Sequence, residues 1–382
     1  MASNYSNVTN NATDYIEWIQ ATQYWAWTLT TIGGLGNMLN ILVILHQLCI
    51  GHTWKNRPWD LRRRDSSPFR SEKPVLPFEG HTLLLLHLCF CDLLYSAVSL
   101  PLTATAYGYA LSNETEKLDA LCPAAAFVRY TNALAEWLTL GLLAFQRCVD
   151  LGRRRNARFF RPGATGLLIA GIWLVSIALQ VIPFAMEEGY GYSRENFKCD
   201  VTNEVLRIIF YALQSLLPCV LMLIGCIGIL YQLRRYTKEM EDINLTSSVS
   251  KQRLVRSSIL VLTLLLLFLV CVVPICVHNL LPKDHFGLNT HIPHGIVIYM
   301  IYWLQYAVNF ILYNIMSANF RSAYRRFFGL VFPVCRSRIN PTRPGTSSVY
   351  SVTTTQTSLS RSLQENRFVR RQSGFQEMQT RY

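Results

Sequence analysis

Seven long apolar stretches constrain this chain of 382 residues more than any other feature of its sequence. They cover residues 24–49, 81–107, 122–149, 164–185, 205–233, 254–281 and 291–316. A helix rises about 1.5 Å per residue, so each stretch can cross the roughly 30 Å of hydrocarbon in a bilayer, whereas strands would need only about 10 residues. A helix also satisfies its backbone hydrogen bonds within the segment. The pattern therefore predicts an all-α fold, a bundle of seven transmembrane helices.

The basic residues lie mostly in alternate gaps between these stretches, which indicates how the chain is oriented. Four of the 36 Lys and Arg residues fall in the gaps after the second, fourth and sixth stretches, namely Lys117, Arg194, Lys198 and Lys283. Arg129 and Arg207 sit just inside stretches, and the remaining 30 lie on the opposite side. By the positive-inside rule, residues 1–23 are extracellular, residues 24–330 form the membrane domain and residues 331–382 are cytoplasmic. The net charge of +13 then reflects topology and attraction to membrane lipids, and no binding to nucleic acid is expected.

Sequons and cysteines on the expected outer side agree with this topology. Four Asn-x-Ser/Thr sequons lie there and are expected to carry glycans, at Asn4, Asn7, Asn11 and Asn113. Of the eleven cysteines, Cys122 and Cys199 are the two placed clearly at the outer face. Because that compartment is oxidising, we expect them to form a disulfide, the alternative being two unpaired thiols. These features predict a multi-pass protein of the plasma membrane.

An ordered set of residues gives the chain a family resemblance. Every stretch contributes to it, with Gly36 and Asn37, Asp92-Leu93-Leu94, Cys122 and Arg147, Trp173, Pro218, Pro274, and Asn309 with Tyr313. Over residues 24–330 the chain resembles the rhodopsin-like G-protein-coupled receptors, and Asn319-Phe320-Arg321 is similar to the start of their short membrane-parallel eighth helix. The resemblance implies a receptor for an extracellular ligand, without enzymatic activity, that activates a heterotrimeric G protein through Arg147 and Tyr313. Arg129-Tyr130 and the run from Asp92 to Tyr95 are similar to the invertebrate Moody and Trapped-in-endoderm-like receptors.

Several switch residues of that family are replaced in this chain. Gln146 stands beside Arg147 where most members have an acid, so we expect a weaker resting restraint on the arginine and raised basal activity. Val272 replaces a tryptophan of the sixth span, Phe310 a proline of the seventh and Cys226 a tyrosine of the fifth. Without that proline, the seventh span should be straighter. A second interpretation is therefore a decoy or scaffold, which binds ligand or a partner without activating a G protein.

Ionisable residues inside the spans are candidates for functional sites, because burying them in lipid is costly. By the resemblance, Asp92 matches the family's sodium site and should face Asn37 and Asn309. Glu136 lies eleven residues before Arg147 and adds a second carboxylate near the same level. Two carboxylates so close would share a cation, with sodium the one cofactor considered, or one would stay protonated. The alternative is that Glu136 pairs elsewhere.

Arg129, seven residues after Cys122, is the candidate for binding the ligand. An arginine at this level of the third span could hold an anionic or lipid-like ligand by two parallel hydrogen bonds. Aromatic residues of the third and seventh spans could complete the pocket, principally Tyr130, Tyr302 and Tyr306. Alternatively, Arg129 extends to the outer headgroups, or it pairs with an acid of the second outer loop, Glu187, Glu188 or Asp200.

The cytoplasmic segments carry the remaining expectations. Residues 50–80 form a first inner loop that is long for the family. Beyond an amphipathic eighth helix over Phe320 to Leu330, Cys335 is a candidate for palmitoylation, or else a free thiol. Residues 331–382 are polar and should be disordered, and phosphorylation between Ser347 and Ser362 would let them dock on an arrestin-like protein. The sequence contains no metal-ligand cluster and no nucleophile with a plausible base, which argues against an enzyme.

Overall fold

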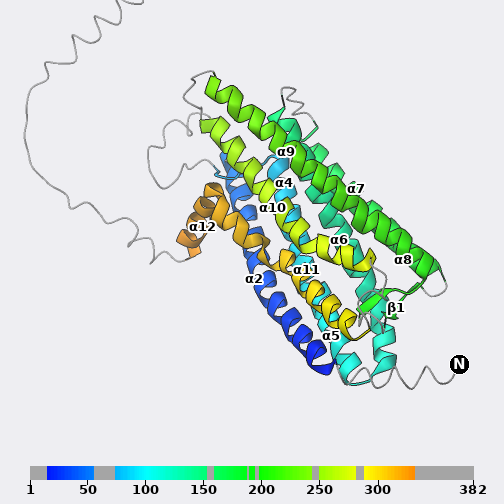
Figure 1. Cartoon of the computed structure of the whole chain (residues 1–382). Helices are drawn as coiled ribbons and strands as arrows, with labels where there is room; N and C mark the ends of the chain where they lie inside the picture. The colour runs from blue at the N-terminus through cyan, green and yellow to red at the C-terminus, as the bar shows by residue number, and fades with distance from the viewer. Residues whose placement is uncertain are drawn as a thin grey trace, which may run out of the picture. The chain divides into compact units, whose positions relative to one another are not determined.

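Helices follow all seven predicted spans and the predicted eighth helix (Figure 1). The computed structural model describes residues 15–55, 74–152, 159–186, 189–193, 198–242, 249–280 and 288–331. The first span is α2 (Ile16–Lys55), and the second consists of α4 (Gly80–Leu94), the π-helical turn η2 (Tyr95–Ser99) and α5 (Leu100–Leu111). The third is α6 (Thr115–Leu151), the fourth is α7 (Pro162–Val181) with the 3-10 turn η3 (Ile182–Ala185), and the fifth consists of α8 (Glu204–Tyr211), the π-helical turn η4 (Ala212–Leu216) and α9 (Leu217–Asp242). The sixth and seventh are α10 (Val249–Leu280) and α11 (Leu288–Met316), and α12 (Ala318–Val331) is the eighth helix. The predicted helical bundle is confirmed, and the described residues add a small β-hairpin.

The helices extend beyond the apolar stretches that predicted them. α2 begins at Ile16 and runs to Lys55, so parts of the expected outer segment 1–23 and of the inner loop 50–80 are helical. A helix needs only its own backbone hydrogen bonds, and it can therefore continue past the hydrocarbon. Residues 56–73 lie outside the described residues, but the chain returns to α2 where the Val75 amide donates to Gln47 Oε1 at 3.2 Å.

α6 is the central helix of the bundle and contacts α4, α5, α7, α9 and α10. Within the described residues, the other six long helical segments are long and apolar enough to cross a membrane. α6 is more polar because Arg129, Asn132 and Glu136 occupy its middle, and all three side chains are buried. The polar groups that lower the hydropathy of α6 therefore face other helices.

The surfaces of α7 and α9 that face away from α6 are apolar. Leu167 and Leu174 on α7 and Leu223 and Ile224 on α9 are among their exposed side chains. A water-soluble monomer rarely exposes contiguous apolar surface of this extent. The arrangement, apolar outside and polar inside, suits a bundle surrounded by lipid.

α11 passes through Phe310 without a break, in agreement with the missing proline. The Phe310 ring packs on α2 at Gly36, where a Cβ atom would lie only 2.3 Å from the ring. Gly36 therefore permits the close approach of α2 and α11, because any side chain there would have to displace Phe310.

The β-hairpin lies at one end of the bundle, here called the hairpin end (Figure 1). Its strands β1 (Tyr190–Ser193) and β2 (Lys198–Val201) are antiparallel, with Gly191 opposite Asp200 and Tyr192 opposite Cys199. All four residues of β2 are buried. The predicted disulfide between Cys122 and Cys199 is confirmed and joins β2 to α6. A covalent link thus holds the hairpin over the interior of the bundle.

α12 lies at the opposite end of the bundle, here called the α12 end (Figure 1). The Phe320 ring stacks on Tyr313 of α11 with centroids 5.3 Å apart. The Tyr324 hydroxyl donates to Asn40 Oδ1, and the Phe327 ring meets His46 edge-on at 5.6 Å. The aromatic face of α12, expected from its sequence, therefore packs against α11 and α2.

Candidate functional site

A cavity of about 250 Å³ lies at the hairpin end, between α6, β2, α8, α10 and α11. Its charged lining residues are Arg129, Lys198, Arg207 and Asp200, so the cations outnumber the acids. Its aromatic lining residues are Tyr130, Trp137, Phe210, Tyr211, Tyr299 and Tyr302. The chemistry of this lining suits a small acidic group attached to an apolar body.

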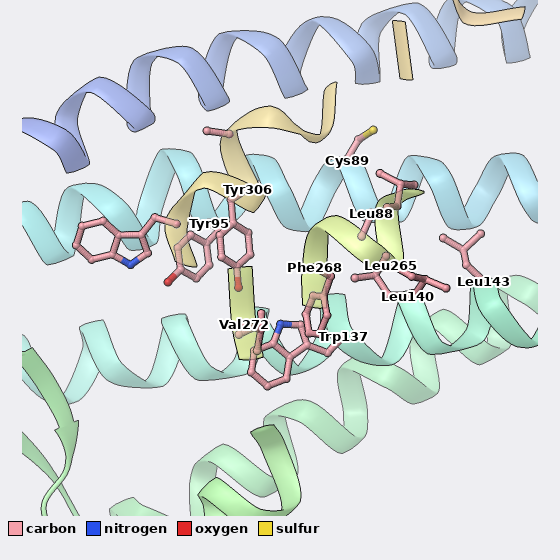
Figure 2. Close-up of a cluster of buried hydrophobic side chains, with 14 of the residues drawn as sticks. Leu88, Cys89, Tyr95, Trp137, Leu140, Leu143, Leu265, Phe268, Val272 and Tyr306 are labelled. Carbon is pink, nitrogen blue, oxygen red and sulfur yellow. The ribbon is translucent and has the colours of Figure 1, made fainter. Parts of the chain in front are cut away.

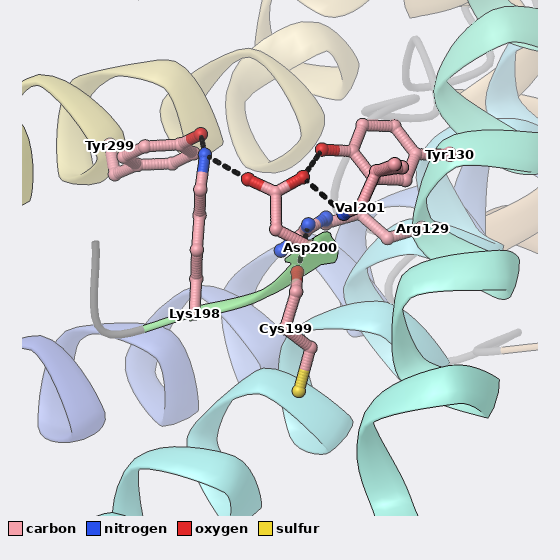
Figure 3. Close-up of polar contacts among 7 residues, drawn as sticks. All are labelled: Arg129, Tyr130, Lys198, Cys199, Asp200, Val201 and Tyr299. Atoms are coloured by element: carbon pink, nitrogen blue, oxygen red, sulfur yellow. Dashed lines mark hydrogen bonds and ion pairs between the residues drawn. The ribbon is translucent and has the colours of Figure 1, made fainter. Parts of the chain in front are cut away.

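Two residues of β2, Lys198 and Asp200, connect α6 to α11 inside this cavity (Figure 3). Lys198 Nζ lies 2.8 Å from Asp200 Oδ2 and also donates to the Tyr299 hydroxyl of α11. Asp200 Oδ1 accepts from the Tyr130 hydroxyl of α6, and from the Val201 amide at 2.8 Å. The hairpin therefore ties two spans together through a single buried ion pair.

The two charges of this ion pair hold each other in the ionised form. Burial raises the pKa of Asp200, but Lys198 and Arg129 outweigh burial, and the net pKa lies below its usual value. Burial lowers the pKa of Lys198, but Asp200 and Tyr299 outweigh burial, and the net pKa lies above its usual value. Both side chains are therefore charged at neutral pH.

Arg129 points from α6 into the same cluster (Figure 3). Its side chain is buried, its Nη2 donates to the Cys199 carbonyl, and its guanidinium lies 4.8 Å from the centroid of the Tyr130 ring. Arg129 is thus held by the hairpin and is not exposed at the surface of the bundle. Of the three acids considered as partners, Asp200 pairs directly with Lys198, and Glu187 and Glu188 lie outside the described residues.

The tyrosines predicted to contact a ligand divide between two levels. Tyr130 and Tyr302 line the hairpin-end cavity, but Tyr306 does not. Tyr306 is fully buried, its hydroxyl lies 2.7 Å from that of Tyr302, and its ring stacks on Tyr95 with centroids 3.5 Å apart (Figure 2). Tyr306 lies one helical turn below the cavity, in the polar interior, and its contact with a ligand stays a prediction.

Trp137 contributes to the cavity from α6 and was not singled out in the sequence. It lines the cavity, and its indole meets the Phe268 ring of α10 edge-on at 5.5 Å (Figure 2). The family's tryptophan on the sixth span is Val272 here, a much smaller side chain that is fully buried. The large aromatic side chain at this level therefore comes from Trp137 of α6 and not from α10. Trp137 contacts both the cavity and the buried core.

The predicted polar network lies at the centre of the bundle. Asn309 Nδ2 donates to both carboxylate oxygens of Asp92, at 3.0 and 3.2 Å, and Asn37 Nδ2 donates to the Tyr306 carbonyl at 2.8 Å. Glu136 faces Asp92 and the Tyr306 hydroxyl, yet neither of its oxygens makes a hydrogen bond of good geometry. The Asn37 side-chain oxygen is also buried without a partner. Two carboxylates and an unused amide oxygen fit the preference of a sodium ion for oxygen ligands.

A second buried network, centred on His87, joins α4, α6 and α7. Trp173 Nε1 donates to His87 Nε2 at 2.7 Å, and His87 Nδ1 lies 2.9 Å from Thr139 Oγ1, which donates to the Ala135 carbonyl. An indole N–H can only donate, so Nε2 accepts and the neutral ring carries its proton on Nδ1. The order of donors and acceptors is thus fixed from Trp173 to Ala135. His87 carried no motif, which is why the sequence did not indicate it.

A larger cavity, of about 980 Å³, lies at the α12 end. Arg147 lines it and is buried, with Nη1 3.4 Å from Asp150 Oδ2 one turn further along α6. Gln146 was expected to leave the arginine weakly restrained, and this stays a prediction, to which the structure adds Asp150 as an acidic partner on the same helix face. Tyr313 is fully buried against Phe320 and does not line this cavity.

The expected modification sites are only partly within the described residues. Asn113 is exposed in the turn between α5 and α6 and has a φ of 57°, a left-handed conformation that asparagine adopts more readily than most residues. Asn4, Asn7, Asn11 and Cys335 lie outside the described residues. Among the described residues, Asn113 is therefore the expected glycan site whose accessibility can be judged.

Helices that enclose a polar central helix, with a cavity at either end and a hairpin fixed by a disulfide, define a multi-pass membrane protein of the seven-helix receptor class. The chain belongs to the rhodopsin family of seven-transmembrane receptors, because the family model described as 7 transmembrane receptor (rhodopsin family) matches residues 80–313. The resemblance drawn from the motifs is thereby confirmed. Members of this family are receptors and not enzymes.

Individual relatives are distant. Protein trapped in endoderm-1 of Drosophila melanogaster is 22% identical over 333 residues, which are 80% of this chain and 76% of that protein. Galanin receptor type 1 of Homo sapiens is 25% identical over 270 residues, 67% of this chain and 74% of that receptor. The crystal structure of squid rhodopsin superposes with a TM-score of 0.61 at 16% identity, covering 84% of this chain and 88% of that chain. The structural likeness establishes the fold alone.

Proposed function

We propose that this chain is a plasma-membrane receptor that binds an acidic extracellular ligand in the hairpin-end cavity. The observation that carries the proposal is the charge of the lining, in which Arg129, Lys198 and Arg207 accompany one acid, Asp200. Guanidinium and ammonium groups bind carboxylate or phosphate by charge-assisted hydrogen bonds. The surrounding aromatic rings would hold the apolar part of the same ligand, which includes the lipid-like molecules considered from the sequence.

The ligand class is tested by comparing acids with their uncharged amides on cells that express the receptor with a G-protein dissociation sensor. Acids should activate and their amides should not, and Arg129→Gln should abolish the response. Lys117→Gln provides a matched control, because Lys117 is an exposed cation on the same helix and lies outside the cavity. Activation by amines that survives Arg129→Gln would show that the ligand is not acidic.

The α12-end cavity is the proposed site for a heterotrimeric G protein, with Arg147 as its main contact. Support comes from the volume of about 980 Å³ and from the position of Arg147 on its wall. Basal dissociation of the G protein should exceed that of mock-transfected cells and should fall to the mock level in Arg147→Ala at equal surface density. A receptor that binds acids but remains at the mock level for every G-protein class would instead be a decoy or scaffold.

A cation between Asp92 and Glu136 is part of the same proposal. The two oxygens of Glu136, neither of which makes a hydrogen bond of good geometry, support it together with the buried Asn37 oxygen. Sodium should raise the melting temperature of the purified receptor relative to N-methylglucamine, and Glu136→Gln should reduce the sodium effect by removing one negative charge. Equal melting temperatures in the two salts would exclude sodium at this site.

The sidedness of the receptor and its cytoplasmic partners complete the proposal. The amino terminus is placed outside, with glycans at Asn4, Asn7, Asn11 and Asn113, on the distribution of basic residues. Palmitoylation of Cys335 and docking of the phosphorylated segment 331–382 on an arrestin-like protein are proposed from sequence alone. Glycosidase treatment of Asn113→Gln beside the wild type tests the orientation, since a shift in electrophoretic mobility attributable to Asn113 requires an extracellular α5–α6 turn.

A further inference from the structure

We propose that Asp200 is an internal ligand of the hairpin-end cavity, which an acidic ligand must displace from Lys198 and Tyr130 before it can bind. The inference rests on the proposed acidic ligand and adds a competitor carried by the receptor itself. The ligand and Asp200 compete for the same two donors, Lys198 and Tyr130.

The surroundings of the Asp200 carboxylate are those of a bound anion. Both its oxygens are used, Oδ2 by Lys198 and Oδ1 by Tyr130 and the Val201 amide (Figure 3). These donors come from α6 and from β2 itself, and Asp200 is only 4% exposed although it belongs to a loop between spans. A ligand carboxylate or phosphate could accept from Lys198 and Tyr130 in the same way.

The hairpin is anchored by contacts that do not involve this carboxylate. Cys199 is joined to Cys122 by the disulfide, and its carbonyl accepts from Arg129. The Tyr190 hydroxyl of the neighbouring strand donates to Gln180 Oε1 at 2.7 Å. The Asp200 side chain can therefore rotate away while the backbone of the hairpin stays in place.

The charge balance favours displacement by an acid. Asp200 balances the charge of Lys198, but Arg129 and Arg207 remain as positive charges in the lining of the cavity. Arg207 pairs with Glu204, but Glu204 is largely exposed and does not line the cavity. An incoming anion thus meets a surplus of positive charge and takes over donors that already suit an anion. The displaced Asp200 would lose Lys198. Because the ligand can bind only while Asp200 is displaced, its apparent affinity is its intrinsic affinity multiplied by the fraction of time that Asp200 is displaced.

A consequence for the helices follows from the position of the pair. Tyr130 of α6 and Tyr299 of α11 are connected through Asp200 and Lys198. When an acid takes Lys198, the link between the two spans no longer passes through Asp200. Binding and the loss of this side-chain link between α6 and α11 are therefore the same event.

The test measures thermal stabilisation of the purified full-length receptor by benzoate and by phenyl phosphate, with benzamide as the uncharged control. In Asp200→Asn, which keeps the shape of the side chain without its charge, the half-maximal concentration of at least one anion should fall by about tenfold or more relative to the wild type. Asp119→Asn is the matched control, because Asp119 is exposed on α6 and lies outside the cavity. The two anions distinguish a carboxylate site from a phosphate site.

Three outcomes separate this inference from the proposed function. A tenfold gain in Asp200→Asn that Arg129→Gln removes supports both. Equal half-maximal concentrations in the wild type and Asp200→Asn, again abolished by Arg129→Gln, leave the acidic ligand in place and overturn the competition. Absence of stabilisation by either anion in every variant overturns both. Asp200→Ser provides a second variant should Asp200→Asn fail to fold, since it removes the internal carboxylate without removing a donor that the ligand uses, and it should strengthen anion binding in the same direction.

Discussion

The pairing of Arg147 with Asp150 predicts that Asp150→Asn raises the basal activity of this receptor. The closest distance between the two side chains is 3.4 Å, and they are 4% and 33% exposed. At an effective dielectric constant near 20, the direct attraction is about 5 kcal/mol, which is an upper bound. Solvent around Asp150 reduces the net value to about 1–2 kcal/mol, between those of exposed and buried pairs. Freeing Arg147 should therefore increase its availability to a G protein by a factor of about 5–30.

The assay is basal G-protein dissociation in cells at matched surface expression. Asp150→Glu keeps the charge and should stay near the wild type, whereas Arg147→Ala combined with Asp150→Asn should return the signal to the mock level. Glu79→Gln serves as a comparison, because Glu79 also attracts Arg147 but is exposed at the start of α4, so its effect should be smaller. Basal activity of Asp150→Asn at or below the wild type, with Arg147→Ala still lowering the signal, would refute the idea that Asp150 restrains the arginine.

Four further predictions concern the stability of the purified receptor, measured as melting temperature at one scan rate. Lys198→Met should destabilise the receptor by about 3–5 kcal/mol, because it leaves the buried Asp200 charge without its ion-pair partner. Adding Asp200→Asn should recover most of this loss, and a double variant that shows the sum of the two single losses would contradict the buried pair. The Lys198–Asp200 pair should make its full contribution to the free energy of unfolding between about pH 3.9 and 10.4. This contribution is lost only as pH falls through the lowered pKa of Asp200 or rises through the raised pKa of Lys198. A loss of stability from the pair near neutral pH would contradict these shifts. His87→Ala should lower the free energy of unfolding by about 1–3 kcal/mol, because it leaves the Trp173 indole N–H without an acceptor. The same loss in a receptor that already carries Trp173→Phe would contradict this cause. Trp137→Ala should cost about 3–5 kcal/mol through the space it leaves beside the core, with Trp137→Phe milder, and equal losses would show that volume is not the cause.

The features that the sequence predicted are those that depend on many residues or on a simple spatial constraint. Each span rests on about twenty apolar positions, so errors at single positions cancel. The disulfide followed from the topology, because Cys122 and Cys199 alone were clearly at the outer face. The ends of the helices were less predictable, since α2 continues to Ile16 and Lys55 with polar residues that the hydrocarbon does not require.

Contacts that depend on local geometry were mostly missed. Asp150 could have been found, because a spacing of three residues places it on the same helix face as Arg147. The ion pair of Lys198 with Asp200 also has a regular signature, since alternate residues of a strand share a face. Although charged and apolar residues alternate in β2, a strand of four residues is too short to be recognised from the sequence alone, so the pairing of Lys198 with Asp200 was not predicted.

Adjacent residues of α6 connect the two candidate sites at the hairpin end and in the centre of the bundle. Trp137 touches the cavity on one side and Phe268 of α10 on the other, while Glu136 faces Asp92 and the Tyr306 hydroxyl. A ligand that moves the Trp137 side chain must act on the same helical turn that places the Glu136 carboxylate. Any exchange of information between the ligand cavity and the central carboxylates can therefore be measured as non-additivity between substitutions at Trp137 and Glu136, whereas spatial proximity alone would not establish it.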